Sequence, residues 1–226
     1  MGEGFLFPLL VVVFGALAGA LAVARYLLKR KRQQAFQLAA LRLGLSYTPE
    51  DPFGLLGLPF ELLSRGDGRG IENVLYGVWQ GSPVHVFDYW YYEESSSGKS
   101  RSRTYYRFSC ALTPIEARCP HLTIAEETFF TRLADALALD DLQFESEEFN
   151  RVFNVKGDHG VGVALLDARM MRWLLERGRG YVFEVHGDQM LAACPRLDPS
   201  ALAGILVTLR DWSAQVPRVV LSLYPK

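Results

Sequence analysis

An uninterrupted apolar run near the N-terminus constrains this chain more than any other feature of its sequence. Residues 5–24 are twenty positions without a charged side chain, and the run continues past Arg25 to Leu28. An α-helix needs about 20 apolar residues to cross a hydrocarbon core of roughly 30 Å. Helix is also the only spanning form open to a single segment, because lipid offers the backbone no hydrogen-bond partners. We therefore predict one transmembrane helix.

A cleaved signal peptide is the alternative interpretation, because the run ends in two A-x-A sites at residues 20–22 and 22–24. The residues before the run include Glu3 and no Lys or Arg, and the run is longer than the apolar core of a signal peptide. These features favour an uncleaved anchor.

Charge next to the run predicts its orientation. Residues 29–32 are four consecutive basic residues, and no basic residue precedes the run. Because Lys and Arg stay on the cytoplasmic side, we predict a single-pass protein of the cell membrane with its N-terminus outside and its C-terminal domain in the cytoplasm. The same cluster could attract anionic lipid, at about 1 kcal/mol per residue, but we favour the interpretation that it is a topology signal alone.

Small residues within the run suggest a helix contact. Gly15 and Gly19 form a G-x-x-x-G motif, a spacing that lets two membrane helices approach closely. They are candidate helix-contact residues, and the expected partners are the lipid bilayer and either a second copy or another membrane protein. The alternative is that Gly and Ala simply fill this span.

The rest of the chain is predicted to be an α+β protein with an antiparallel sheet and packed helices. We divide the chain into an anchor with its basic flank (1–32), a juxtamembrane helix and Pro/Gly-rich connector (33–70) and a cytoplasmic α+β domain (71–226). Residues 33–226 carry 19 basic and 24 acidic side chains, a net charge of -5. This charge argues against a nucleic-acid partner.

Alternation of polar and apolar residues predicts three strands, at 71–80, 84–92 and 104–113. Gly81-Ser82 predicts a tight hairpin, and residues 93–103 are predicted to be a polar loop. Four further segments are predicted from local signals: a helix after the capping-box spacing at 123–126, a strand at 149–155, a helix capped by Asp167 and a hairpin at Gly187-Asp188. Asp198-Pro199 begins the clearest helix, with an apolar face formed by Leu202, Ile205, Leu206, Leu209 and Trp212.

Motifs for chemistry are weak. Three cysteines and four histidines are scattered, and the pair Cys119 and His121 lacks the second pair that a zinc site needs. No G-x-S-x-G elbow occurs, and Gly98-Lys99-Ser100 lacks the first glycine of a phosphate-binding loop. We therefore predict no catalytic residue, no cofactor and no metal ligand.

Two surfaces remain as candidates for binding. Lys99, Arg101 and Arg103 lie in the predicted loop and form a candidate surface for an anion or a partner, with an unspecific hairpin tip as the alternative. The aromatic run at 89–92 faces a second pair of tyrosines at 105–106. Because strands alternate faces, some of these rings must be exposed unless both faces of the sheet are covered, and we favour coverage.

The motif FESEEFNRVFNV at 144–155, followed by a Met-containing helix and an aromatic strand, resembles a bacterial family of uncharacterised, membrane-anchored proteins with a domain of unknown function. The resemblance covers about residues 144–193. It implies membrane anchoring and assigns no catalytic residue. Some members resemble two-span proteins, so their topology does not carry over in full.

Two functions therefore stand side by side. The favoured one is a membrane protein whose α+β domain binds or scaffolds a partner, and the alternative is a membrane-anchored enzyme with a dispersed site. A polar pocket with several titratable groups would favour the enzyme. A filled core with an exposed aromatic patch would favour the binding protein.

Overall fold

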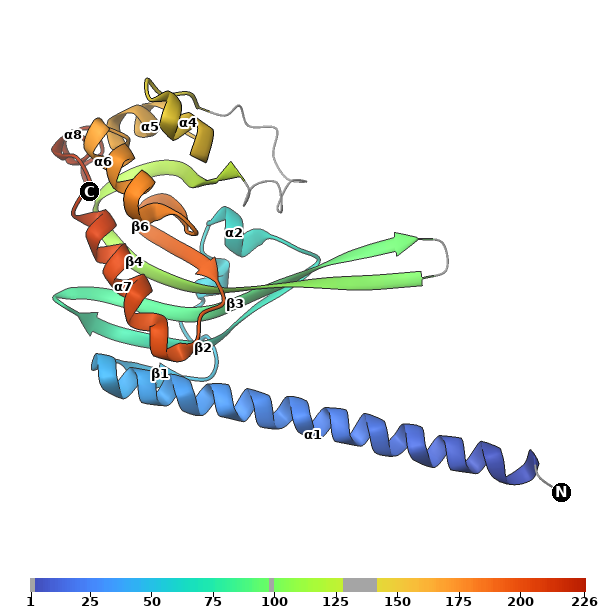
Figure 1. Cartoon of the computed structure of the whole chain (residues 1–226). Coiled ribbons are helices and arrows are strands. Elements are labelled where there is room, and N and C mark those ends of the chain that lie inside the picture. Colours follow the sequence, from blue (N-terminus) through green and yellow to red (C-terminus); the bar gives the residue numbers. More distant parts are fainter. Residues whose placement is uncertain (1–2, 98–99, 128–141) are drawn as a thin grey trace.

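The apolar run folds as part of one long helix, α1 (Glu3–Leu43). In the computed structural model, which describes residues 3–97, 100–127 and 142–226, this helix projects far beyond the rest of the chain (Figure 1). Its described part from Val11 is long and apolar enough to cross a membrane, with a mean hydropathy of 2.1 in the most apolar window. The predicted juxtamembrane helix at 33–43 is its uninterrupted continuation, and Gly44, with φ of 68°, ends it in the left-handed conformation.

Within the described residues, six strands form one antiparallel sheet in the order β1-β2-β3-β4-β5, with β6 paired along β4. Their bounds are β1 Ser46–Thr48, β2 Gly68–Trp79, β3 Ser82–Ser97, β4 Ser100–Glu126, β5 Phe153–Gly157 and β6 Val182–Pro195. The predicted α+β class with an N-terminal membrane-type helix is confirmed.

The hairpin between β2 and β3 turns one residue earlier than predicted. Trp79 pairs with Ser82, so the loop residues are Gln80 and Gly81, with φ of 48° and 87°. Two positive φ values define a type I′ turn, whose twist matches the flanking strands.

The predicted polar loop at 93–103 is wrong. β3 and β4 stay paired from Glu93 and Thr104 out to Ser97 and Ser100, and we call this protruding part the arm (residues 92–97 and 100–105). Serine-rich composition suggested a loop, but the ladder satisfies the backbone and Arg103 pairs with Glu94 across it, at 2.7 Å.

Long strands also replace two other predicted features. The capping-box residues 123–126 belong to β4 and pair with β5, and residues 123–125 also pair with β6, so no helix begins there. The helix face expected after them lies outside the described residues. The predicted hairpin at Gly187-Asp188 is wrong, because β6 is one strand. Gly187, with φ of 57°, lies where the register of β4 against β6 shifts between Pro114 and Cys119, and a Gly at a bulge resembles a Gly in a turn.

The predicted strand at 149–155 is wrong for residues 149–152, which are helical. Helix α4 (Glu147–Val152) comes first, because the Ser146 hydroxyl accepts a hydrogen bond from the Phe149 N–H at 3.2 Å and caps it. Strand β5 then follows. Earlier in the chain, a short helix, α2 (Glu61–Ser64), follows the turn η1 (Leu55–Gly57).

The C-terminal helices begin at the predicted caps. Asp167 caps α6 (Ala168–Trp173), and Asp198 caps the turn η3 (Pro199–Ala201) that leads into α7 (Leu202–Ser213). The other elements are α5 (His159–Leu165), the π-helical turn η2 (Leu174–Gly178) and α8 (Arg218–Leu223).

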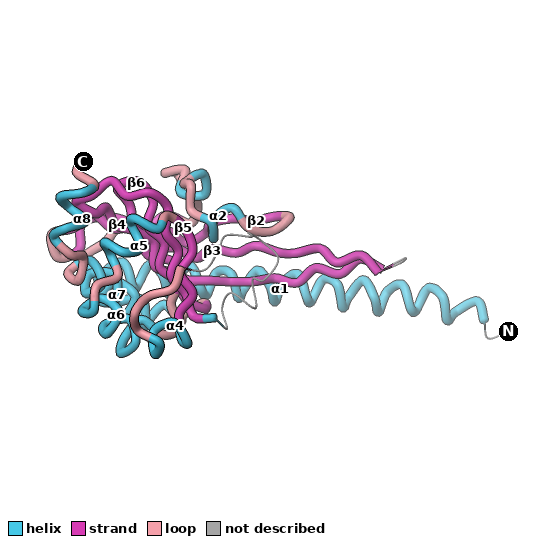
Figure 2. Tube along the Cα trace, turned by 90° about the horizontal axis from the view of Figure 1, so that it is seen from above, coloured by secondary structure: helices cyan, strands magenta, loops and turns pink. Residues whose placement is uncertain are grey.

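Each face of the sheet has its own core. The end of α1 and the helices α4 to α8 cover one face, in a cluster that includes Phe36, Val86 and Trp212. The segment with η1 and α2 covers the other, in a cluster that includes Phe60, Tyr89 and Tyr91 (Figure 2). Residues 33–70, predicted as a connector, thus contribute to both cores, and they cover two of the aromatic side chains at 89–92.

Helix α7 supplies a direct test of this packing. Leu206 is 1% exposed and its neighbour Val207 is 37% exposed. We expect Leu206→Ala to lower the free energy of unfolding by about 2–5 kcal/mol, because it leaves a cavity, and Val207→Ala to lower it by less than about 1 kcal/mol. Urea denaturation of the detergent-solubilised chain, followed by tryptophan fluorescence, measures both. Equal losses would contradict the buried face.

Candidate groove between helix α1 and the sheet

A buried aspartate ties helix α1 to the sheet. Asp88 on β3 is 2% exposed, and its two carboxylate oxygens accept hydrogen bonds from Nε and Nη2 of Arg32, each at 2.6 Å. Arg32 also donates to the carbonyl of Leu197, at 3.0 Å, and Arg196 lies 3.4 Å from the same carboxylate. A bidentate pair of this kind fixes both distance and orientation.

A bulge in β2 completes the environment of Asp88. The register of β2 shifts between Glu72 and Leu75, and Asn73 there adopts a left-handed φ of 58°. Its side-chain Nδ2 donates to Asp88 at 3.0 Å, while its side-chain Oδ1 accepts a hydrogen bond from the Tyr47 hydroxyl at 3.1 Å. The buried carboxylate is therefore satisfied from three elements.

Arg32 thus has a structural role that the sequence did not reveal. It was grouped with the basic flank, yet only 16% of its side chain is exposed, and it points to the sheet and not to solvent. The signal that was missed is Asp88 itself. A single carboxylate inside the aromatic and β-branched run at 84–92 requires a charged partner if the strand is buried.

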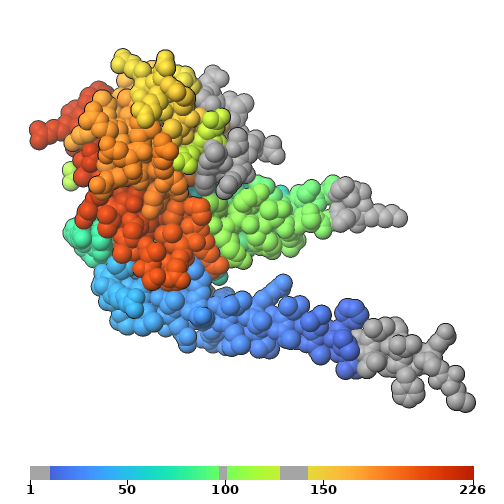
Figure 3. Space-filling view, in the orientation of Figure 1, coloured from blue at the N-terminus to red at the C-terminus, as the bar shows by residue number. Residues whose placement is uncertain are grey.

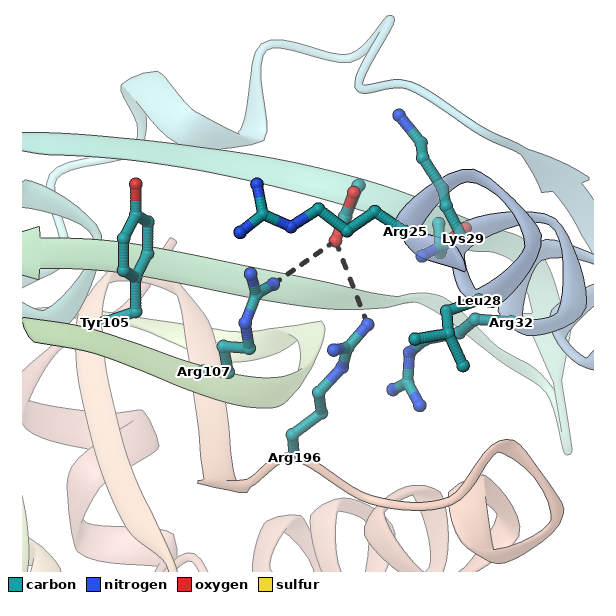
Figure 4. A pocket seen from close by; sticks show the side chains of 9 residues that line it. Arg25, Leu28, Lys29, Arg32, Tyr105, Arg107 and Arg196 are labelled. Atoms are coloured by element: carbon teal, nitrogen blue, oxygen red, sulfur yellow. Dashed lines mark ion pairs between the residues drawn. The ribbon is translucent and has the colours of Figure 1, made fainter. Parts of the chain in front are cut away.

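Beside this ion pair lies an open groove of about 770 Å³ (Figure 4). Its lining is mostly basic and comes from α1, β2, β4 and the residue after β6: Arg25, Leu28, Lys29, Arg32, Glu72, Asn73, Tyr105, Arg107 and Arg196. Glu72 lies between two of the arginines, 3.7 Å from Arg107 and 3.9 Å from Arg196. Arg25 and Lys29 have no acidic partner in the described part of the chain.

Aromatic rings extend the groove along the arm. Trp90 and Tyr92 share the face of β3 that carries Asp88, because side chains alternate along a strand. Tyr105 lies opposite Tyr92, and the three rings are in mutual contact with centroids 5.3–6.4 Å apart. Gly68 and Gly70 leave room for them, because an added Cβ would come within 2.4 Å of the Tyr92 ring and 2.9 Å of the Trp90 ring.

The arm and α1 leave the sheet on the same side (Figures 1 and 3). Two of the three residues of the predicted anion surface, Arg101 and Arg103, lie on this arm, and the surface stays a prediction. Arg103 is paired with Glu94 and lies 4.7 Å from the centre of the Tyr92 ring; Arg101 is exposed; Lys99 lies outside the described residues.

Gly15 and Gly19 lie on the exposed part of α1. A Cβ built at either glycine would meet no other described atom within 4 Å. The predicted helix contact therefore has an open face, and no part of the described chain occupies it.

A second titratable cluster lies on the opposite face of the sheet. The buried carboxylate of Glu184 accepts hydrogen bonds from the backbone N–H groups of Glu61 and Leu62, at 2.6 and 2.9 Å, and lies 3.4 Å from Nε2 of His121. The hydrogen bond to Glu184 raises the pKa of His121. Burial and the neighbouring His121 lower the pKa of His186.

The cysteines are unsuited to nucleophilic chemistry. All three are buried, and burial raises the pKa of Cys119 to about 11, that of Cys194 to about 12, and that of Cys110 well above its ordinary value. A thiol in this environment stays protonated near neutral pH. In the described residues, no group of three or more His, Cys, Asp or Glu side chains is arranged to hold a metal ion.

The Arg32–Asp88 pair predicts a large effect of one substitution in the basic flank. We expect Arg32→Gln to lower the free energy of unfolding by about 3 kcal/mol, because it leaves Asp88 buried without its cation. Lys31→Gln removes the same charge from an exposed neighbour and should cost no more than about 0.5 kcal/mol. Adding Asp88→Asn to Arg32→Gln should restore part of the loss. Equal effects of the two single variants in urea denaturation would contradict the pair.

His121 predicts a pH-dependent contribution to stability. Because its pKa is raised in the folded state, the contribution is complete below the unfolded-state pKa of about 6.5 and is lost as pH rises through the folded-state value. The stability lost in His121→Asn should therefore be larger at about pH 5.5 than at about pH 8.5. His85→Asn should show the opposite trend, because burial lowers the pKa of His85. The same loss at both pH values for His121→Asn would be inconsistent with its contact to Glu184.

Comparison with known proteins gives one informative likeness. No family model matches the sequence, and no curated protein does, so the resemblance carried by residues 144–155 stays a prediction. Among solved structures, the crystal structure of the mycobacterial trehalose monomycolate transport factor A, TtfA, is similar, with a TM-score of 0.59 at 13% sequence identity. The match covers 84% of this chain and 97% of that chain, and it shows a common fold.

Proposed function

We propose that this chain is a single-pass protein of the cell membrane whose α+β domain lies in the cytoplasm and binds or scaffolds a partner at the membrane surface. One observation carries the proposal. The helix that can span the membrane continues without a break into the sheet domain, where Arg32 is paired with the buried Asp88. A flexible tether would allow the domain to move away from the bilayer, whereas this helix holds it in place.

Binding is favoured over catalysis by the chemistry of the groove. Four of its nine lining residues are arginines, which stay charged and do not transfer protons near neutral pH. The His121–Glu184 pair is the nearest alternative for acid–base chemistry, but both Glu184 oxygens accept backbone hydrogen bonds at the start of α2. The partly exposed rings beside the groove are of the kind that mark binding surfaces.

The structural neighbour supports a role at a membrane. TtfA is described as a transport factor for trehalose monomycolate. By analogy, we propose that this chain is an accessory protein of a membrane process and is not itself an enzyme. The resemblance of residues 144–155 to uncharacterised membrane-anchored proteins points the same way.

Orientation can be tested with a reporter. A reporter fused after Lys226 should behave as cytoplasmic, because four basic residues follow the span and none precedes it. A cytoplasmic and a periplasmic reporter fused at the same point provide the paired measurement. Activity of the periplasmic reporter alone would overturn the orientation.

Self-association through the span is a separate proposal. We expect Gly15→Ile with Gly19→Ile to weaken dimerisation at least fivefold in a membrane two-hybrid assay, because bulky side chains hold two backbones apart. Ala20→Ile with Ala24→Ile is the matched control, since these residues have the same spacing on the other side of the helix. Equal signals from both variants would leave the glycines without a contact role.

A further inference from the structure

Four cations from three separate segments line the groove. Arg25 and Lys29 come from α1, Arg107 from β4, and Arg196 from the residue after β6. Figure 4 shows the side chains of Arg25, Arg107 and Arg196 pointing into the same space. Residues this far apart in sequence reach one space only because the sheet is folded against the helix.

The protein supplies too little negative charge for these cations. Asp88 is held by its bidentate pair with Arg32 and is shared with Arg196 at 3.4 Å, and Glu72 is the carboxylate that lines the groove itself. Glu72 lies 3.7 and 3.9 Å from its two arginines, longer than a direct hydrogen bond. Burial, together with the positive charges of Arg32 and Arg107, lowers the pKa of Arg196. A bound anion would stabilise the charged form of this guanidinium.

The surroundings of the groove favour a ligand that lies in a bilayer. Leu28 lines the groove on α1, and Tyr105, which is 50% exposed, lines it on the arm. Trp90 and Tyr92 continue the aromatic surface towards the arm, and the arm and α1 project from the sheet on the same side (Figure 1). Trp and Tyr are enriched where a membrane protein meets lipid headgroups, and a volume of about 770 Å³ is large enough for a headgroup.

We propose that this groove binds the phosphate of an anionic phospholipid headgroup, with Arg25, Lys29, Arg107 and Arg196 as its ligands and the acyl chains left in the leaflet beside α1. The proposal rests on the membrane anchoring given under the proposed function, but not on the orientation. Arginine suits this task because its planar guanidinium donates two hydrogen bonds to a phosphate. Arg32 is excluded from the set, since Asp88 and the Leu197 carbonyl occupy it.

Native mass spectrometry of the full chain in detergent, titrated with phosphatidylglycerol, tests the site. Arg25→Gln with Lys29→Gln removes two of the four cations without touching the Asp88 pair. We expect this variant to bind phosphatidylglycerol roughly 25-fold more weakly, about fivefold for each cation lost. Arg107→Gln with Arg196→Gln should give a similar loss, measured on protein whose melting curve shows that it is folded.

Matched controls separate this site from general charge attraction. Arg172→Gln with Arg218→Gln removes two exposed arginines from α6 and α8 and should leave the affinity unchanged. Phosphatidylcholine, which carries no net charge, should bind at least fivefold more weakly than phosphatidylglycerol to the native chain. Equal weakening by control and groove variants, or equal binding of the two lipids, would overturn the proposal.

Glycerol 3-phosphate distinguishes a lipid from a soluble phosphate. It should fail to displace phosphatidylglycerol at equal concentration, because it lacks the acyl chains that hold the headgroup at the groove. Displacement at equal concentration would overturn the lipid assignment. The reporter fused after Lys226 tests the orientation independently, so failure of the proposed function and failure of this site give different results.

Discussion

Asp88 is a carboxylate placed in the interior of a sheet, and much of the architecture follows from how its charge is satisfied. Removing such a group from water costs several kcal/mol unless a cation and further hydrogen bonds replace the solvent. Arg32, Asn73 and Arg196 do this from a membrane-type helix, a bulged strand and the end of β6. The position of α1 on the sheet is therefore tied to a contact that tolerates little displacement.

The alternation of side chains along a strand then places the aromatic rings and Arg107 on the same face as Asp88. Trp90 and Tyr92 follow Asp88 at two-residue spacing, and Arg107 and Tyr105 are their cross-strand partners. One face of β3 and β4 thus runs from a buried ion pair through a basic groove to an aromatic arm. The other face carries Tyr89 and Tyr91 into the core under α2. The same alternation separates the groove and the aromatic arm from the core under α2.

The sequence predicted those parts that depend on local pattern. The apolar run, the caps at Asp167 and Asp198 and the buried face of α7 are short-range signals, and the structure confirms them. Predictions failed where a distant partner decides the outcome. Gly187 has the local sequence of a turn, but pairing with β4 keeps β6 as one strand. The serine-rich arm has the composition of a loop, but the pairing of β3 with β4 makes it a hairpin. The groove was missed for the same reason, since Arg107 and Arg196 meet α1 only in the folded chain.

The Arg32–Asp88 pair predicts that α1 and the sheet domain move as one rigid body. Spin labels at Leu21→Cys on α1 and Val163→Cys on α5 occupy exposed positions, while the three native cysteines are buried. Double electron–electron resonance in lipid nanodiscs should give one narrow distribution of the distance between the two labels, and Arg32→Gln should broaden that distribution. A broad distribution in the otherwise native chain would contradict the claim, because it would show that the helix and the sheet domain move independently.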